Sequence, residues 1–289
     1  MGFLSHIHAC NNHSSAGFLP FLIGDLRVGL VRQNFARALE QWPGLFELTD
    51  AALILSPALK TFGARTQAVA RILPQLVQQG VMTHLHGEQY VVTPSTPEKG
   101  LMCIDRAAAP YFGIRAFGQH LNGLVREGGE LKLWVARRAA DRRHYPGKLD
   151  NLVAGGLPHG ISRDDNLIKE CWEEAGITAD MARRACPVSV ISYRAETATG
   201  FKPDTLYCYD LELPGNFIPC CTDGEVEAFY LWPVEKVKAI VRDTDKFKLN
   251  CNLVVIDFMI RHGYIGPEEP HYFELLGSLA PSVDSKMQR

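Results

Sequence analysis

Three glutamates crowd one short stretch of the sequence, and their spacing suggests metal chemistry. Glu170, Glu173 and Glu174 stand at i, i+3 and i+4, so a helix of 3.6 residues per turn makes them neighbours. Like charges at these spacings repel one another, and the helix dipole disfavours acids in the last turns. A segment that breaks two electrostatic rules suggests a bound cation. A solvated acidic helix face is the ordinary alternative.

The residues around the acids predict the helix that carries them. Ser162 is a suitable N-cap, with Asp165 three residues later, and Gly176 supplies the stop. At about 100° per residue, the glutamates should lie opposite one apolar face. That predicted face consists of Leu167, Ile168, Cys171, Trp172 and Ala175.

A glycine-rich loop precedes this helix at a fixed distance. Gly155, Gly156 and Gly160 allow the backbone to approach a ligand closely and to adopt dihedral angles closed to other residues. We therefore predict that Gly155 and Gly156 form a loop that contacts the phosphates of a substrate.

This pattern resembles the Nudix box, from Gly155 through the glutamates to Ile177, with every spacing matched. Two positions differ: Ile161 stands where the box has its first Glu, and Lys169 stands where it has Arg. Lys169 keeps the charge but lacks the planar guanidinium fork.

The resemblance extends to the thiamine-pyrophosphokinase-related Nudix hydrolases, which carry an additional N-terminal domain. The similar segments are residues 10–12, 28–29, 65–66, 88–91, 145–156, 223–227, 247–250 and 257–263. It implies an α+β fold, in which a Nudix-type mixed β-sheet sandwiched by helices follows a smaller α/β N-terminal domain. We place the N-terminal domain at residues 1–110, as an accessory and substrate-specificity unit, and the Nudix domain at 111–289.

The activity that the resemblance implies is metal-dependent hydrolysis of a diphosphate linkage in a small molecule, thiamine diphosphate or its oxidised analogues, to the monophosphate. Mg²⁺, or Mn²⁺ in its place, would be held by Glu170 and Glu174, with Glu173 in support. Glu225 resembles the family's further acid, so it would complete the metal site and is also the candidate general base. Glu227 is the second choice, because period-2 spacing could put both acids on one strand face.

Other functions remain open from the residues alone. Ile161 and Lys169 motivate a catalytically silent module that binds a diphosphate metabolite. A different nucleoside diphosphate derivative as substrate, or isomerase-type proton transfer on an allylic diphosphate, would keep the same metal site. The candidates for contacting the substrate ring are Tyr145, Tyr193, Arg194 and Phe201.

Composition narrows the class of protein. The 289 residues are 46% hydrophobic, with 30 Lys+Arg against 32 Asp+Glu and no basic run, which argues against nucleic acid as a partner. The sequence has neither an apolar segment long enough to span a membrane nor a signal peptide, so we expect a cytosolic protein. The eight cysteines lack CxxC spacing, which predicts reduced, mostly buried thiols rather than a zinc site or disulfides. A homo-oligomer is compatible with the sequence but has no support in it.

Periodicity predicts the remaining elements. Paired strands are expected at 18–31, with a turn at Gly24, and at 114–125 and 130–138, joined around Gly128-Gly129. His84, His86 and Glu88 alternate, but this spacing fits a solvated strand face better than a metal site. The other expected strands are 88–92, 149–155, 187–196, 205–213 and 225–231, and the other helices are 65–81, 233–241, 250–261 and 270–279.

Overall fold

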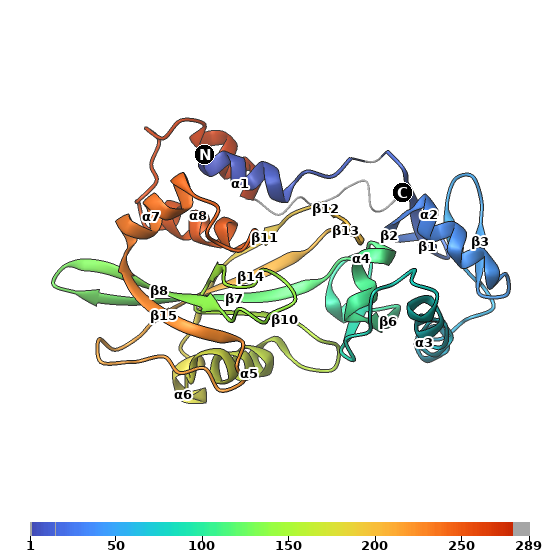
Figure 1. Ribbon diagram of the computed structural model, residues 1–289, viewed down its shortest axis with the longest axis horizontal. Coiled ribbons are helices and arrows are strands. Elements are labelled where there is room, and N and C mark those ends of the chain that lie inside the picture. Colours follow the sequence, from blue (N-terminus) through green and yellow to red (C-terminus); the bar gives the residue numbers. More distant parts are fainter. Residues whose placement is uncertain (1, 15, 280–289) are drawn as a thin grey trace.

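The computed structural model describes residues 2–14 and 16–279 and divides the fold between two β-sheets (Figure 1). The smaller sheet has the strand order β2-β1-β4-β3, in which β1 and β4 run parallel. Its strands are β1 (Phe18–Ile23), β2 (Leu26–Arg32), β3 (Phe46–Leu48) and β4 (Leu53–Leu55). The predicted strand pair at 18–31 is confirmed, and Gly24 turns the chain with φ 59°.

Short helices and a two-stranded sheet complete this N-terminal α/β domain. The predicted helix at 65–81 is present as α3 (Phe62–Gln78), which Thr61 caps and which continues through Pro74. The hairpin of β5 (Gln89–Val92) and β6 (Met102–Asp105) lies next to α3. The other helical segments are α2 (Gln33–Ala38), η1 (Leu39–Gln41), η2 (Pro97–Lys99), η3 (Arg106–Ala108) and α4 (Ala109–Phe112).

The larger sheet is mixed, as predicted. Its strand order is β11-β14-β7-β8-β15, with β10 beside β7 and β9 beside β8, and only β14 and β7 pair in parallel. Gly128 and Gly129 both have positive φ in the turn from β7 to β8. The strands are β7 (Phe117–Glu127), β8 (Glu130–Arg138), β9 (Leu149–Asp150), β10 (Val153–Gly156), β11 (Cys186–Ser192), β14 (Thr205–Glu212) and β15 (Val226–Pro233); β12 (Ala195–Thr197) and β13 (Gly200–Lys202) form a separate hairpin.

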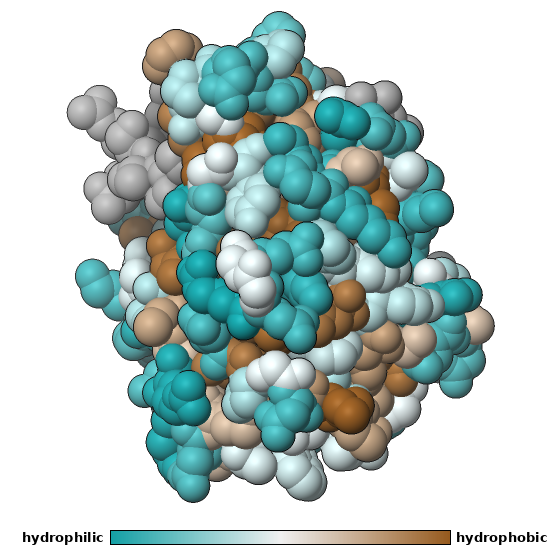
Figure 2. Space-filling model, turned by 90° about the vertical axis from the view of Figure 1, so that its left-hand side faces the viewer, coloured by the Kyte–Doolittle hydropathy of each residue, from teal (hydrophilic) through white to brown (hydrophobic). Residues whose placement is uncertain are grey.

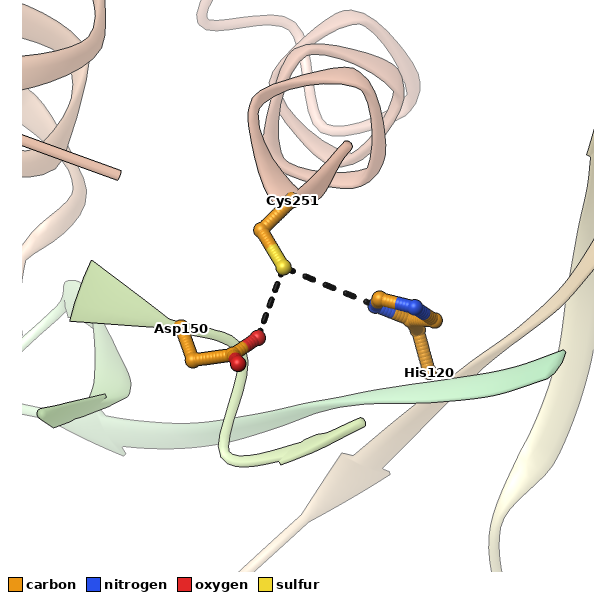
Figure 3. A group of neighbouring side chains, drawn as sticks. All are labelled: His120, Asp150 and Cys251. Atoms are coloured by element: carbon orange, nitrogen blue, oxygen red, sulfur yellow. Dashed lines mark hydrogen bonds between the residues drawn. The ribbon is translucent and has the colours of Figure 1, made fainter. Parts of the chain in front are cut away.

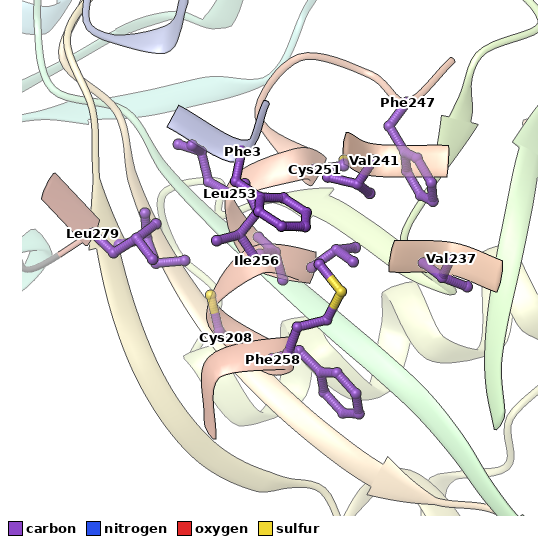
Figure 4. Close-up of a cluster of buried hydrophobic side chains, with 14 of the residues drawn as sticks. Phe3, Cys208, Val237, Val241, Phe247, Cys251, Leu253, Ile256, Phe258 and Leu279 are labelled. Atoms are coloured by element: carbon purple, nitrogen blue, oxygen red, sulfur yellow. The ribbon is translucent and has the colours of Figure 1, made fainter. Parts of the chain in front are cut away.

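Helices cover both faces of the larger sheet, which confirms the predicted sandwich (Figure 1). One face carries α5 (Arg163–Ala175) and α6 (Ala179–Ala182), and the other carries α7 (Val234–Asp243), α8 (Cys251–Arg261) and α9 (Tyr272–Leu279). The first helix, α1 (Phe3–Cys10), joins this second layer. Figure 4 shows Phe3 of α1 among the buried side chains of α7 and α8, so the start of the chain helps to build the core of the larger sheet.

The surface and the cysteines agree with a globular protein. Figure 2 shows a face that is mostly hydrophilic, with small hydrophobic areas between the polar groups. All eight cysteines are free thiols and most are buried, as predicted. Within residues 2–14 and 16–279, no helix is long and apolar enough to cross a membrane.

Candidate active site

The acidic helix forms as the sequence predicts. Ser162 Oγ accepts a hydrogen bond from Asp165 N–H at 3.1 Å, and Gly176 ends α5 in the left-handed conformation with φ 65°. The predicted division of its faces is wrong at two positions, because Trp172 is 53% exposed and Glu174 is buried. Glu174 follows Leu167 by seven residues, which is two turns, so both side chains lie on the side that packs against the sheet.

Two of the three carboxylates are withdrawn from solvent. Glu174 is 7% exposed, and its Oε2 accepts a hydrogen bond from Ala154 N–H at 2.8 Å. Burial, with the nearby charges of Asp150 and Glu170, raises the pKa of Glu174 to about 8. Burial also raises the pKa of Glu170. Like-charged carboxylates held out of water are disfavoured alone and are stabilised by a cation.

Glu173 lies on the outer side of the helix and takes part in an ion pair. Lys169 Nζ lies 2.7 Å from Glu173 Oε2, an i, i+4 pair, and 3.2 Å from Glu170 Oε1. Lys169 therefore screens two of the carboxylates from each other.

The two glycines of the predicted phosphate loop make room for protein groups. A Cβ at Gly155 would lie 2.3 Å from Cδ of Glu170, and a Cβ at Gly156 would lie 2.0 Å from Oη of Tyr90. The missing side chains thus let α5 approach β10 from one side and the N-terminal domain approach it from the other. A direct contact of either glycine with phosphate stays a prediction.

Glu225 is held near the end of the acidic helix. Thr222 N–H donates to the carbonyl of Glu173 at 2.8 Å, and Cys220 N–H donates to that of Ala175 at 3.1 Å, so this loop is fastened to α5 just before Glu225. Glu225 Oε1 accepts from Arg142 at 2.6 Å.

Glu227, the second candidate for the general base, contacts Arg137 and Ala140. Its carboxylate lies 2.7 Å from Nε of Arg137 and accepts from Ala140 N–H at 3.1 Å. The expected alternation of Glu225 and Glu227 is wrong, because the register of β15 shifts between Val226 and Ala228 and a bulge interrupts period 2.

Ile161, the first departure from the Nudix box, packs between the two domains. It lies against a small cluster of Val91 from β5, Phe117 from β7 and Leu157 from the loop after β10. His159 N–H also donates to the carbonyl of Gln89 at 2.7 Å. Ile161 is partly buried against this cluster, and its contact with the apolar side chains suits an apolar residue better than an acid at this position.

The same contact brings three residues to the site that sequence reasoning missed or undervalued. Tyr90 is 7% exposed and its hydroxyl faces Gly156. The Arg106 guanidinium lies over the Tyr90 ring, with Cζ 5.6 Å from the ring centroid. Glu88 Oε2 accepts from Arg106 Nη1 at 2.7 Å. Glu88 lies just before β5, so the expected strand face carrying His84, His86 and Glu88 does not form there. No spacing in the sequence links Tyr90 to Gly156, which lies 66 positions further along the chain.

Two of the suggested ring contacts are buried in other roles. Tyr193 donates its hydroxyl to Asp204 Oδ2 at 2.8 Å, and Phe201 packs its ring against that of His13 with centroids 4.1 Å apart. Tyr145 is 41% exposed and has φ 54°.

A hollow of about 400 Å³ lies where the N-terminal domain meets the start of α5. Its lining runs over residues 157–164 and includes Val91, Pro97 and Glu98. It lies at the opposite end of α5 from the glutamates and does not enclose them.

Three buried side chains from β7, β9 and α8 converge: His120, Asp150 and Cys251 (Figure 3). Asp150 accepts from Cys251 Sγ at 2.6 Å and lies 3.1 Å from both Lys248 Nζ and Arg138 Nη1. Because two cations already neutralise this carboxylate, the trio is suited to internal hydrogen bonding rather than to a further cation.

Both domains of the chain match known domain families. Residues 122–251 match the profile of the NUDIX domain, and residues 2–116 match a domain of unknown function, DUF4743. Nudix hydrolase 20, chloroplastic, of Arabidopsis thaliana is 42% identical over 95% of this chain and 76% of its own length. Nudix hydrolase 24, chloroplastic, of the same plant is 43% identical over the same shares. An uncharacterized protein of Saccharomyces cerevisiae is 32% identical over 80% of this chain and 72% of its own.

Proposed function

We propose that the substrate of this protein is thiamine diphosphate or an oxidised analogue. The premise is that the chain belongs to the Nudix hydrolase family and hydrolyses a phosphoanhydride of a diphosphate compound. The observation that carries the site is the group of carboxylates on α5, with Glu174 fixed against β10 by Ala154 N–H. The support for thiamine is the resemblance of segments in both domains to the thiamine-pyrophosphokinase-related subfamily.

Nudix enzymes generally use divalent metal ions, and the residues present here fit one. We propose Mg²⁺, or Mn²⁺ in its place, held by Glu170 and Glu174 with Glu173 in support, because hard cations prefer oxygen ligands. The raised pKa of Glu174 agrees with this assignment, since a buried acid beside other acids lacks a neutralising partner. When bound, the metal would neutralise the phosphate oxygens and orient water.

Residues of the chain would accept the proton from water and position the phosphates. Glu225 would accept a proton from water through Oε2, since Arg142 engages Oε1. The bonds from Thr222 and Cys220 to the end of α5 support this role, because they fasten the loop before Glu225 to the helix that carries the proposed metal ligands. Gly155 and Gly156 would let the backbone approach the phosphates.

Three broader assignments accompany this proposal. The N-terminal domain, placed at residues 1–110, would contribute to substrate specificity, because Tyr90 and Arg106 reach Gly156. A cytosolic location rests on the reduced cysteines, whereas the names of the two plant relatives place those proteins in chloroplasts. The partner is a small molecule.

A substrate comparison tests the proposal. The purified protein is assayed with Mg²⁺ on thiamine diphosphate, its oxidised analogues and ADP-ribose, with monophosphate release as the readout. We expect the highest kcat/KM for a thiamine-type diphosphate. A higher kcat/KM for ADP-ribose would replace thiamine by a nucleoside diphosphate derivative, and ligand binding without any product would favour a silent binding module.

A further inference from the structure

The free edge of β10 is where the acidic helix and the N-terminal domain meet. Among the strands of residues 2–14 and 16–279, only β7 pairs with β10, so the opposite edge of β10 meets side chains instead, such as Asn166, whose Nδ2 donates to Gly156 O at 2.9 Å. Ala154 N–H points to this open edge, where it donates to Glu174. Backbone N–H groups alternate in direction along a strand, so Gly156 N–H, two residues further, points to the same edge.

A cation from the N-terminal domain lies over the face of β10 at Gly156. A Cβ at Gly156 would lie 3.6 Å from Cζ of Arg106. Along β10, the carboxylate of Glu174 at the edge is therefore followed by the N–H of Gly156, with the guanidinium of Arg106 over the adjoining face. Burial lowers the pKa of Arg106, but Tyr90 and Glu88 raise it above its ordinary value, and the negative charge of Glu225 adds a smaller contribution in the same direction.

We propose that Arg106 is a phosphate-binding residue that the N-terminal domain contributes to the diphosphate site, where stacking over the Tyr90 ring holds it in place. The proposal rests on the proposed function, because it requires a diphosphate at the α5 carboxylates. One phosphate would lie near those carboxylates with the metal, and the other would receive hydrogen bonds from Gly156 N–H and Arg106.

The chemistry of Arg106 suits an anion. Guanidinium presents five N–H donors in a planar fork that matches phosphate oxygens. Among the residues that the structure describes, only Glu88 accepts from this side chain, through Nη1, and the side chain is 40% exposed. The fork is thus preoriented over the Tyr90 ring and keeps donors for a ligand.

The alternative role for Arg106 is a clamp that only fastens the two domains together. Both roles predict harm from Arg106→Gln, but they differ for Glu88→Gln. A clamp needs both members of the ion pair, so the two variants should lose thermal stability alike and bind ligand alike. In a phosphate site, Glu88 competes with the ligand for the guanidinium, so its removal leaves ligand binding intact or stronger.

The test is calorimetric binding of methylenediphosphonate, which cannot be hydrolysed, to the full chain with Mg²⁺. We expect Arg106→Gln to weaken binding at least about tenfold, the loss of one charge-assisted hydrogen bond, and Arg106→Lys to restore part of it. Glu88→Gln should bind as tightly as wild type or more tightly. Arg126→Gln, which removes the exposed ion pair with Glu212, is the matched control and should leave binding unchanged.

Equal affinity of Arg106→Gln and wild type would overturn the proposal, as would equal weakening by Arg106→Gln and Glu88→Gln, or no binding to wild type. The outcome is separable from that of the proposed function. A wild type that binds the probe but hydrolyses no diphosphate keeps the Arg106 site and refutes the activity. If the wild type hydrolyses thiamine diphosphate, and Arg106→Gln changes neither the KM nor the affinity for the probe, the activity is kept and the Arg106 site is refuted.

Discussion

Glu174 combines features that few surface acids have. It lies on the packed side of α5, it accepts a hydrogen bond from the backbone of β10, and its pKa is raised to about 8. Glu170 lies beside the same strand, against Gly155. Two carboxylates in so little water are costly without a cation, so the metal and the local fold stabilise each other.

The pKa of Glu174 predicts how metal binding depends on pH. Below about pH 8 the metal-free side chain carries a proton, which the metal must displace, so affinity for Mg²⁺ should increase with pH. We expect up to about a tenfold gain per pH unit between pH 6 and 8, and a plateau above, in titrations followed by calorimetry. Glu174→Gln should bind weakly with a much flatter profile. A wild-type affinity that is constant over this range would contradict the assignment.

At the scale of elements, β10 is the part on which the site depends. It receives α5 through Gly155 and the β5–β6 hairpin through Gly156, and its open edge holds Glu174 through Ala154. Each glycine is needed for a close approach between elements, so side chains at these positions would separate the two halves of the site.

Gly156→Ala tests this dependence. The added Cβ would lie 2.0 Å from the hydroxyl oxygen of Tyr90, so the buried Tyr90 side chain or the strand that carries it must shift. We expect a loss of about 1–3 kcal/mol in the free energy of unfolding, typical of overpacking, and a fall in turnover.

Tyr90→Phe in the same chain removes the clashing oxygen and should restore part of both losses. The control is Gly63→Ala in α3, where nothing lies within 4 Å, and it should be neutral or stabilising by up to about 1 kcal/mol. Urea unfolding and turnover measure the set. An unaltered Gly156→Ala protein would mean that Tyr90 does not support β10.

At the scale of the molecule, the N-terminal domain and the Nudix domain form one unit around the site. The first helix joins the core of the larger sheet, and Val91 packs on Phe117 and Leu157. Ile161 belongs to this contact, which explains why an apolar residue replaces the glutamate of the box.

Restoring that glutamate should therefore harm the protein. In Ile161→Glu, a carboxylate would enter an apolar interface without a partner, so we expect a loss of about 1–3 kcal/mol of stability and no gain in turnover. Ile218→Glu, at a position 81% exposed, should change stability by less than about 0.5 kcal/mol. Denaturant unfolding compares the two. Higher turnover and unchanged stability in Ile161→Glu would refute the packing explanation.

Local sequence patterns predicted the secondary-structure elements better than they predicted the residues that make up the site. Apolar periodicity, caps and glycines predicted α5 and the β7–β8 hairpin, because these signals act within a few residues. The sandwich was implied by the family resemblance. The same signals identified the α5 carboxylates. Tyr90 and Arg106 could not be predicted, because their place at Gly156 depends on how two domains pack. The bulge at Glu227 likewise depends on pairing with β8 rather than on its own spacing.

The central claim is that the α5 carboxylates hold a metal with which the enzyme cleaves a diphosphate. Its most direct measurement is the release of thiamine monophosphate from thiamine diphosphate, with and without Mg²⁺, by wild type and by Glu174→Gln. The account predicts turnover that requires Mg²⁺ and a kcat at least about a hundredfold lower in the folded variant, since metal stabilisation of the transition state is worth several kcal/mol. A folded Glu174→Gln enzyme with wild-type kcat, or wild-type turnover without divalent metal, would contradict it.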